Sequence, residues 1–366
     1  MPFGATRETR AIRIALAARA PGKARGATEN PPGRFEHWRR AQEPEAHREQ
    51  SAPPTEIRFE RARTIVCSND SPDIPFRRSV NPYRGCEHGC IYCYARPSHA
   101  YLGLSPGLDF ETKIYAKANA AELLRRELAR PDYRPEPIAF GTNTDCYQPA
   151  ERRLRIMRAI LELLAACRHP LTITTKSALV ERDLDLLAPM ARAALVRVYV
   201  SVPTLDERLA RRLEPRAPSP ARRIQTLAAL AAAGVPCGVM VAPVVPALTD
   251  AGIENVLETA ARAGARTAGW VLLRLPWELR PLFEAWLERH VPLRASHVLS
   301  LLRALRAGQV NDPRFGTRMT GEGPYAELLA RRFALACRRF GLAGRDAPPL
   351  ETRLFRPPAG AQGELF

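Results

Sequence analysis

The feature that most constrains the fold is an alternation of two patterns between about residue 60 and residue 277. Short runs rich in β-branched and aromatic residues alternate with longer windows of helical periodicity. The expected strands are 77–85, 137–142, 170–176, 194–202, 234–245 and 267–276. The expected helices between them are 150–167, 180–193, 219–234 and 250–264. This order predicts an α/β fold with a parallel sheet and right-handed crossovers. About six repeats are too few for a closed eight-stranded barrel and favour an open, partial one.

The segments on either side of this core have a different composition. Residues 1–55 are rich in Pro, Gly, Ala, Arg and Glu and are expected to be mostly disordered, although Phe35 and Trp38 could dock part of them onto the body. Beyond the core, helical patterns cover 278–290, 295–308 and 324–341. The domain boundaries that we expect are 1–55 (extension), 60–277 (core), 278–345 (helical region) and 346–366 (flexible tail).

The chain is strongly basic, with Lys+Arg 55 against Asp+Glu 38 and a formal net charge of +17. A polyanionic partner such as nucleic acid is one explanation. The other is a coding bias toward arginine and alanine, because the excess is spread along the chain. No apolar run approaches the ~20 residues of a membrane span. The N-terminus lacks a secretory apolar segment. We therefore expect a cytoplasmic protein with no membrane association.

Three of the eight cysteines stand close together in the stretch RGCEHGCIYCYARPSH, at Cys86, Cys90 and Cys93. They follow an expected strand and precede a helix, at the edge of the sheet where α/β folds carry out chemistry. A disulfide would leave one thiol over and does not suit a reducing compartment. Zinc needs a fourth ligand, such as His88, His99 or a distant cysteine. An iron–sulfur cluster with three thiolates would keep one iron open to an external molecule.

The spacing Cys-x3-Cys-x2-Cys, with Tyr92 directly before the last cysteine, resembles the signature of the radical S-adenosylmethionine (SAM) superfamily. The resemblance implies a partial (β/α)6 TIM-like barrel and a 4Fe-4S cluster held by Cys86, Cys90 and Cys93. It also implies reductive cleavage of SAM to a 5′-deoxyadenosyl radical that abstracts a substrate hydrogen. Tyr92 would lie against the adenine. An electron donor such as flavodoxin or ferredoxin is the expected partner of such a monomeric enzyme.

Further stretches resemble the spore photoproduct lyase-like branch of this superfamily and uncharacterised bacterial relatives. They include GTNTDCYQPAE, TITTKS, VSVPT and LEPRAPSPARRIQTLAALAAAG. The Gly-Gly-Glu motif that many members carry after the second strand is absent. By resemblance, SAM would contact Thr144, Lys176, Ser201 and Arg223. The alternatives are a capped turn for Thr144, a strand-end serine for Ser201 and solvated side chains for Lys176 and Arg223.

Cys146 is a further candidate, because spore photoproduct lyases return hydrogen to a product radical from a cysteine near this strand end. The match is not residue for residue, since that cysteine aligns with Thr142 in this chain. Cys146 is therefore either a hydrogen donor or an ordinary core cysteine.

Two classes of function remain open for this chain. The first is a radical SAM enzyme with an unidentified substrate, with DNA, RNA, a peptide or a small metabolite as candidates. The second is a zinc-stabilised, non-enzymatic nucleic-acid-binding protein. The cysteine loop favours the first and does not identify the substrate.

Overall fold

A seven-stranded sheet forms the centre of the protein in the computed structural model, which describes residues 25–27, 29–35, 53–343 and 348–358. Its strand order is β10-β9-β8-β7-β6-β3-β2, in which β2 and β3 are antiparallel and every other neighbouring pair is parallel. The strands are β2 (Val66–Ser68), β3 (Arg78–Val80), β6 (Ile138–Phe140), β7 (Leu171–Thr175), β8 (Val196–Ser201), β9 (Cys237–Val244) and β10 (Thr267–Leu272). The parallel α/β sheet expected from the sequence is therefore confirmed.

A second, three-stranded sheet was missed from the sequence. Its order is β1-β5-β4, with β1 (Glu56–Glu60) parallel to β5 (Lys113–Lys117) and β4 (Tyr83–Arg84) antiparallel to it. Because β4 leads into the cysteine loop, this sheet fixes the position at which the loop begins.

Helices connect the parallel strands of the central sheet. They are α2 (Ala120–Leu128), α3 (Glu151–Leu154), α4 (Ile156–Ala166), α5 (Leu184–Arg192), α6 (Glu207–Leu213), α7 (Pro220–Ala232) and α8 (Ile253–Arg262). Shorter elements are α1 (Leu108–Thr112) and the 3-10 helices η1 (Arg96–Leu102), η2 (Ala178–Asp183) and η3 (Asp250–Gly252). Helix α8 buries Ile253, Val256, Leu257 and Ala260. These positions form one face of a 3.6-residue helix, which explains the periodicity seen in the sequence.

Local signals define the ends of α7 as expected. The Ser219 side chain accepts a hydrogen bond from the Arg222 N–H (3.3 Å), Pro220 opens the helix, and Gly234 follows it with φ +73°. The expected start at Thr249 differs, because the Thr249 hydroxyl accepts from the Val245 N–H (2.8 Å) and caps no helix.

The helix predicted over 150–167 is interrupted at Arg155, which has φ +52° and separates α3 from α4. The cause is the buried Glu151 carboxylate, which accepts hydrogen bonds from the Met157 N–H (3.1 Å) and the Arg158 N–H (3.4 Å). These groups are free N–H donors at the start of α4, so Glu151 caps the helix from outside.

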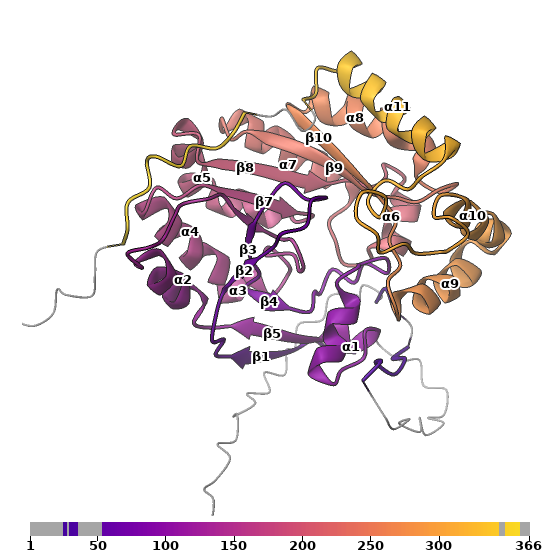
Figure 1. The fold of residues 1–366 in the computed structure, drawn as a ribbon, viewed down its shortest axis with the longest axis horizontal. Coiled ribbons are helices and arrows are strands. Elements are labelled where there is room, and N and C mark those ends of the chain that lie inside the picture. The colour runs from indigo at the N-terminus through magenta and orange to yellow at the C-terminus, as the bar shows by residue number, and fades with distance from the viewer. Residues whose placement is uncertain (1–24, 28, 36–52, 344–347, 359–366) are drawn as a thin grey trace, which may run out of the picture.

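The three C-terminal helices agree with the expectation: α9 (Leu279–His290), α10 (Pro292–Ala304) and α11 (Pro324–Arg339). Helix α11 packs on α8, and α9 packs on α10 (Figure 1). No helix within the described ranges is long and apolar enough to cross a membrane.

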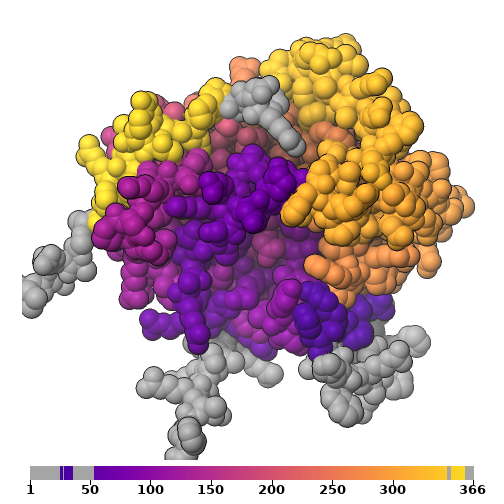
Figure 2. Space-filling model, in the orientation of Figure 1, coloured from indigo at the N-terminus to yellow at the C-terminus, as the bar shows by residue number. Residues whose placement is uncertain are grey.

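Both terminal segments contact the body more than the sequence suggested. The Arg34 side chain pairs with Glu278 (3.1 Å), and Figure 2 shows the indigo N-terminal segment against the orange C-terminal helices. At the other end, the Phe355 ring lies 5.4 Å from that of Tyr133 and 5.3 Å from that of His169. Residues 348–358 thus differ from the flexible tail expected over 346–366. Trp38 and most of 1–55 lie outside the described residues.

Candidate functional site

The cysteine loop connects β4 to η1 through successive tight turns. The Cys86 N–H donates to the Phe110 carbonyl (2.9 Å), and the Cys93 N–H donates to the Cys90 carbonyl (3.2 Å). Gly89 has φ +67°, and a Cβ there would lie 2.7 Å from Glu111 Oε2. The turn therefore requires glycine at this position, both for its conformation and for its contact. The three cysteines are free thiols, with Cys86 and Cys90 buried and Cys93 half-buried.

An ion pair between Arg96 and Glu111 supports the cysteine loop. Arg96 is fully buried, and its Nε donates to the Cys90 carbonyl (2.9 Å) while its Nη2 pairs with Glu111. The Glu111 carboxylate also accepts from the Gly26 N–H (2.9 Å) and the Ala27 N–H (2.7 Å). A buried carboxylate that satisfies three donors fixes the loop and the N-terminal segment together.

Gln148 supports the loop from the opposite side. Its amide nitrogen donates to the Gly85 carbonyl (3.0 Å), and its amide oxygen accepts from the Glu87 N–H (3.0 Å). These two backbone groups flank Cys86, and the Gln148 side chain is fully buried. Gln148 thus connects the backbone on both sides of Cys86 to the segment that follows β6.

The thiols lie close enough to one another to interact electrostatically. Burial, the Asp145 carboxylate and the neighbouring Cys90 and Cys93 raise the pKa of Cys86 well above its ordinary value. Burial raises the pKa of Cys90 to about 12, against the opposing effect of the Lys176 ammonium. Burial therefore favours the neutral thiol at Cys86 and Cys90, and a bound metal would supply the positive charge that stabilises their thiolates.

Lys176 lies at the carboxyl end of β7, beside the cysteine loop. Its Nζ is 5.8 Å from the centroid of the Tyr92 ring. Burial would lower the pKa of Lys176, but Cys90 and Glu214 outweigh it, so the pKa is raised. The structure thus brings together Lys176, Tyr92 and Cys90, which the sequence had predicted at one site.

Tyr92, Glu214 and Arg223 form a buried chain of polar contacts. The Tyr92 hydroxyl donates to the Glu214 carboxylate, which also pairs with the Arg223 guanidinium. Burial would raise the pKa of Glu214, but Arg223 and Lys176 lower it below its usual range. Arg223 further donates to the Ser201 carbonyl (2.9 Å) and the Pro218 carbonyl (2.9 Å). Its guanidinium therefore binds the protein itself and positions Tyr92 through Glu214.

The other predicted SAM contacts are placed at strand ends. Thr144 is buried, and its hydroxyl donates to the Tyr83 carbonyl (2.9 Å). Ser201 ends β8 and is also buried. Next to Thr144, the Asp145 carboxylate accepts from the Lys176 N–H (2.8 Å) and lies 3.3 Å from His88 Nδ1. These contacts tie the ends of β6 and β7 to the cysteine loop.

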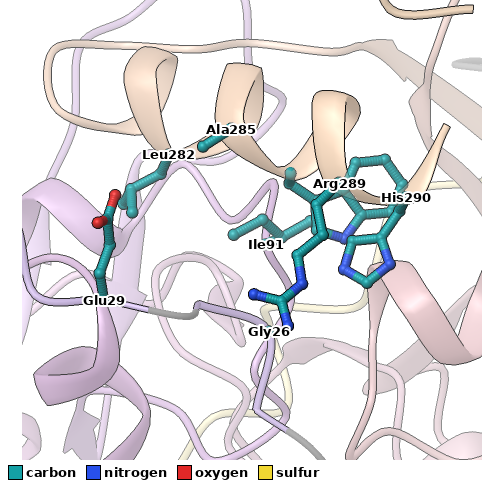
Figure 3. Close-up of a pocket in the computed structure, with 8 residues that line it drawn as sticks. Gly26, Glu29, Ile91, Leu282, Ala285, Arg289 and His290 are labelled. Carbon is teal, nitrogen blue, oxygen red and sulfur yellow. The ribbon is translucent and has the colours of Figure 1, made fainter. Parts of the chain in front are cut away.

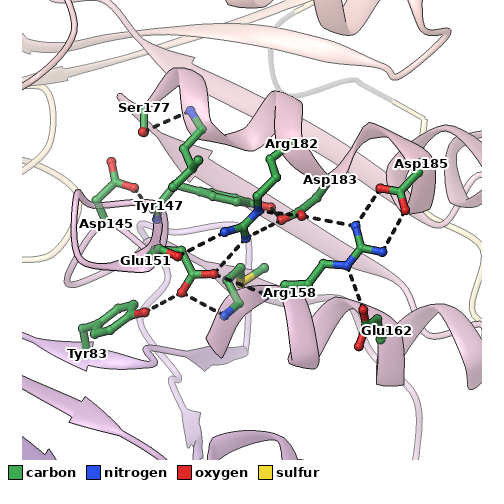
Figure 4. A network of polar contacts seen from close by, with 12 residues as sticks. Tyr83, Asp145, Tyr147, Glu151, Arg158, Glu162, Ser177, Arg182, Asp183 and Asp185 are labelled. Carbon is green, nitrogen blue, oxygen red and sulfur yellow. Dashed lines mark hydrogen bonds and ion pairs between the residues drawn. The ribbon is translucent and has the colours of Figure 1, made fainter. Parts of the chain in front are cut away.

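Cys146 points into the protein core and is fully buried. Burial and the Asp145 and Glu151 carboxylates raise the pKa of its thiol well above the usual value. The next residue, Tyr147, donates to Asp183 (3.0 Å), which belongs to the ion-pair network of Figure 4. The structure thus places Cys146 among core residues, and its predicted hydrogen-donor role stays untested.

The network in Figure 4 is built from charged side chains of α3, α4, η2 and α5. The Arg182 guanidinium pairs with Glu151 (2.9 Å) and Asp183 (2.9 Å), and Arg158 binds both oxygens of Asp185 (2.7 and 2.7 Å). Glu151 also accepts from the Tyr83 hydroxyl. Through the Tyr147 hydroxyl, which donates to Asp183, the network also holds the segment that follows Asp145.

A separate pocket lies between the N-terminal segment and α9 (Figure 3). Gly26, Ile91, Trp286 and Arg289 are among its lining residues. Ile91 belongs to the cysteine loop, but none of the predicted site residues lines this pocket. Its lining makes it distinct from the candidate site.

The described parts of the chain contain no group of three His, Cys, Asp or Glu side chains arranged to hold a single metal ion. A mononuclear zinc site needs four ligands around one point. In an iron–sulfur cluster, by contrast, separate thiolates can bind separate irons, which suits a loop with three free thiols.

The sequence profile of the Radical SAM superfamily matches residues 80–260, which span the loop and the strands up to β9. The chain belongs to the radical SAM superfamily. It is 43% identical over 280 residues to an uncharacterised protein of Mycobacterium tuberculosis, covering 75% of this chain and 78% of the relative. An uncharacterised protein of Methanocaldococcus jannaschii is 28% identical over 171 residues, covering 47% of this chain and 61% of the relative.

Solved structures share the fold of this chain. A spore photoproduct lyase variant with bound AdoMet and dinucleoside spore photoproduct superimposes with a TM-score of 0.59 at 17% identity. The match covers 79% of this chain and 81% of that chain. Another variant of the same lyase gives a TM-score of 0.58 at 18% identity, with the same coverage.

Sequence reasoning missed several residues that hold the site. Arg96, Glu111 and Gln148 brace the cysteine loop, and Glu214 connects Tyr92 to Arg223. Gln148 and Glu214 lie inside stretches that resemble the lyase-like branch, which is the one signal that could have singled them out. Arg96 lies inside the cysteine stretch, which carries the same resemblance, whereas Glu111 has no local pattern that separates it from surface charges.

Proposed function

We propose that this radical SAM enzyme holds a 4Fe-4S cluster on Cys86, Cys90 and Cys93 and binds SAM at the remaining iron. The observation that supports this most directly is the placement of three free, mutually interacting thiols beside the Lys176 ammonium. When bound, the cluster supplies the electron for reductive cleavage of SAM to methionine and a 5′-deoxyadenosyl radical.

The residues around the loop suit the parts of SAM that they would bind. Lys176 offers a cation to the carboxylate, and the buried Thr144 after β6 and Ser201 at the end of β8 offer hydroxyls to the polar groups. Tyr92 offers an aromatic face to the adenine, with its hydroxyl held by Glu214. Arg223 acts on the cofactor indirectly, by keeping Glu214 ionised and in place.

We also propose an electron donor, a location and an oligomeric state for the enzyme. An electron donor of the flavodoxin or ferredoxin class reduces the cluster, and the enzyme works as a cytoplasmic monomer. The sheet curves into a partial (β/α)6 barrel whose open side admits the substrate. DNA or RNA is one candidate for that substrate, because the net charge of +17 attracts a polyanion, and a peptide or a small metabolite is the other.

Anaerobic purification followed by metal analysis tests the cluster. We expect a brown protein with about four irons per chain, and an electron paramagnetic resonance signal of the reduced cluster that changes when SAM is added. A colourless protein with one zinc per chain would instead support the zinc-stabilised, non-enzymatic alternative.

Lys176→Gln tests the SAM site separately from the cluster. The variant is expected to keep the iron content of the wild type and to lose most of the SAM-induced spectral change. An unchanged spectral response would remove Lys176 from the site.

A further inference from the structure

Three exposed aromatic side chains from distant parts of the chain surround one guanidinium. The carbon centre of the Arg34 guanidinium lies 4.8 Å from the ring centroid of Phe35, 5.0 Å from that of Tyr101 and 4.5 Å from that of Trp277. Phe35 comes from the N-terminal segment, Tyr101 from η1, and Trp277 from the segment between β10 and α9. We call Phe35, Tyr101 and Trp277 the aromatic platform.

The side chains of the aromatic platform stay exposed, although burying them would stabilise the fold. Tyr101 is 68% and Trp277 66% exposed, although large aromatic side chains normally bury much of their surface. Trp277 also has φ +46°, a conformation that costs free energy in a residue with a side chain. The next residue, Glu278, pairs with Arg34 (3.1 Å) and so holds Trp277 in this position. Neighbouring contacts thus maintain an exposed, strained tryptophan.

The platform lies next to the candidate active site. The Arg34 guanidinium donates to the Pro97 carbonyl (3.4 Å), four residues after Cys93. Three residues before Trp277, the Arg274 guanidinium lies 5.9 Å from the ring of Tyr94, which follows Cys93 directly. The Tyr94 hydroxyl donates to the Thr142 carbonyl at the end of β6. The rim of the site therefore continues from Tyr94 through Arg274 to the platform.

Arg274 places a guanidinium on this rim; the Asp73 carboxylate acts on it electrostatically but forms its ion pair with Arg318. Within the described part of the chain, no carboxylate forms an ion pair with Arg274, and its Nη1 contacts the Met319 sulfur (3.9 Å). Its Nε is buried with no hydrogen-bond partner there. A half-buried guanidinium of this kind gains free energy from an incoming anion.

We propose that this rim binds a single-stranded stretch of nucleic acid, with bases stacked on the aromatic platform and a phosphate on Arg274. Exposed aromatic faces beside a cation are the combination by which proteins hold unpaired nucleotides. The net charge of +17 adds an attraction toward any polyanion. The inference rests on the proposed function only in calling this strand the substrate, because binding itself requires neither cluster nor SAM.

Fluorescence anisotropy on the full-length protein tests the inference, with labelled oligothymidylate and oligouridylate of about 15 nucleotides at several salt concentrations. Trp277→Ala is expected to weaken binding about tenfold and to leave the salt dependence unchanged, because stacking is not electrostatic. Arg274→Gln is expected to reduce the slope of log K against log salt by about 0.7, the value for one phosphate contact on a single strand. Phe59→Ala, which changes an exposed aromatic residue on β1, serves as the matched control.

Several outcomes would overturn the inference. The first is equal affinity of Trp277→Ala and Phe59→Ala for the oligonucleotides. The second is that the wild type binds a duplex of the same length as tightly as the single strand. The third is binding of an acidic peptide in place of the oligonucleotides. Normal oligonucleotide binding by a protein that forms no 5′-deoxyadenosine would instead contradict the proposed chemistry and leave the binding site intact.

Discussion

The hydroxyl of Tyr92 and the carboxylate of Glu214 form a buried hydrogen bond between positions 122 residues apart in the sequence. Tyr92 lies between two of the cysteines, whereas Glu214 follows α6. The bond therefore connects the cysteine loop to the far half of the sheet. Because Arg223 and Lys176 both face this carboxylate, its charge also balances two cations beside the thiols.

Glu214→Gln is expected to lower the free energy of unfolding by about 3 kcal/mol, because it leaves the buried Arg223 without its counter-ion. Chemical denaturation of the apoprotein measures this loss. Glu207→Gln, in the exposed first turn of α6, is the matched control and should change stability by less than about 0.5 kcal/mol. Equal stability of the two variants would show that the Glu214 pair contributes nothing.

Gln148→Ala removes the bridge between the Gly85 carbonyl and the Glu87 N–H. We expect a loss of about 2 kcal/mol or more in unfolding free energy, since two buried backbone groups lose their partner. The iron content after anaerobic reconstitution should fall as well, because the loop around Cys86 is no longer fixed. Gln309→Ala, at an exposed position after α10, should retain the iron content of the wild type. A fully loaded Gln148→Ala protein would show that the bridge is dispensable.

The stability of the protein is expected to fall with acid through buried histidines. Burial lowers the pKa of His169 from 6.5 to about 4, against a raising effect of its hydrogen bond to the Pro170 carbonyl. The unfolded chain therefore binds a proton at a pH at which the folded one does not. The stabilising effect is complete above pH 6.5 and is lost as the pH falls toward 4. Between pH 7.5 and 5 the loss from this residue amounts to ~2 kcal/mol.

Denaturation curves at pH 7.5 and pH 5 measure this dependence. His169→Phe should reduce the difference between the two curves, and His297→Phe, at an exposed position of α10, should not. An unchanged difference in His169→Phe would assign the acid sensitivity to other groups, such as His99, whose pKa burial also lowers to about 4.

The sequence was sufficient to predict the strands and helices that have a strong local pattern. Strand β7 alternates buried and half-buried residues, and α8 has an apolar face. Strands β1 and β5 were missed because each needs its partner 57 positions away, as in the pair Glu56–Lys113, to form a sheet. Helix α6 was missed because it is short and buries only Ala210 and Leu213, although the Asp206 side chain caps its start.

The cysteine loop could be predicted because its signature is contiguous. Its supports could not, since the contacts of Arg96 with Glu111 and of Gln148 with Gly85 depend on how distant segments fold together. The contacts of Arg223 were likewise beyond what the sequence could predict. The resemblance implied a contact of Arg223 with SAM, which stays a prediction, and the contacts of its guanidinium with Glu214 and two backbone carbonyls could not be read from the sequence.

The most direct test of the central claim is the dithionite-driven formation of 5′-deoxyadenosine from SAM by anaerobically reconstituted protein. The wild type is expected to form it and Cys90→Ala to form none, with the iron content of the variant lowered in parallel. Cys237→Ala, which removes a buried thiol from β9, should retain both properties. Formation of 5′-deoxyadenosine by Cys90→Ala at the rate of Cys237→Ala would contradict the assignment of Cys90 as a cluster ligand.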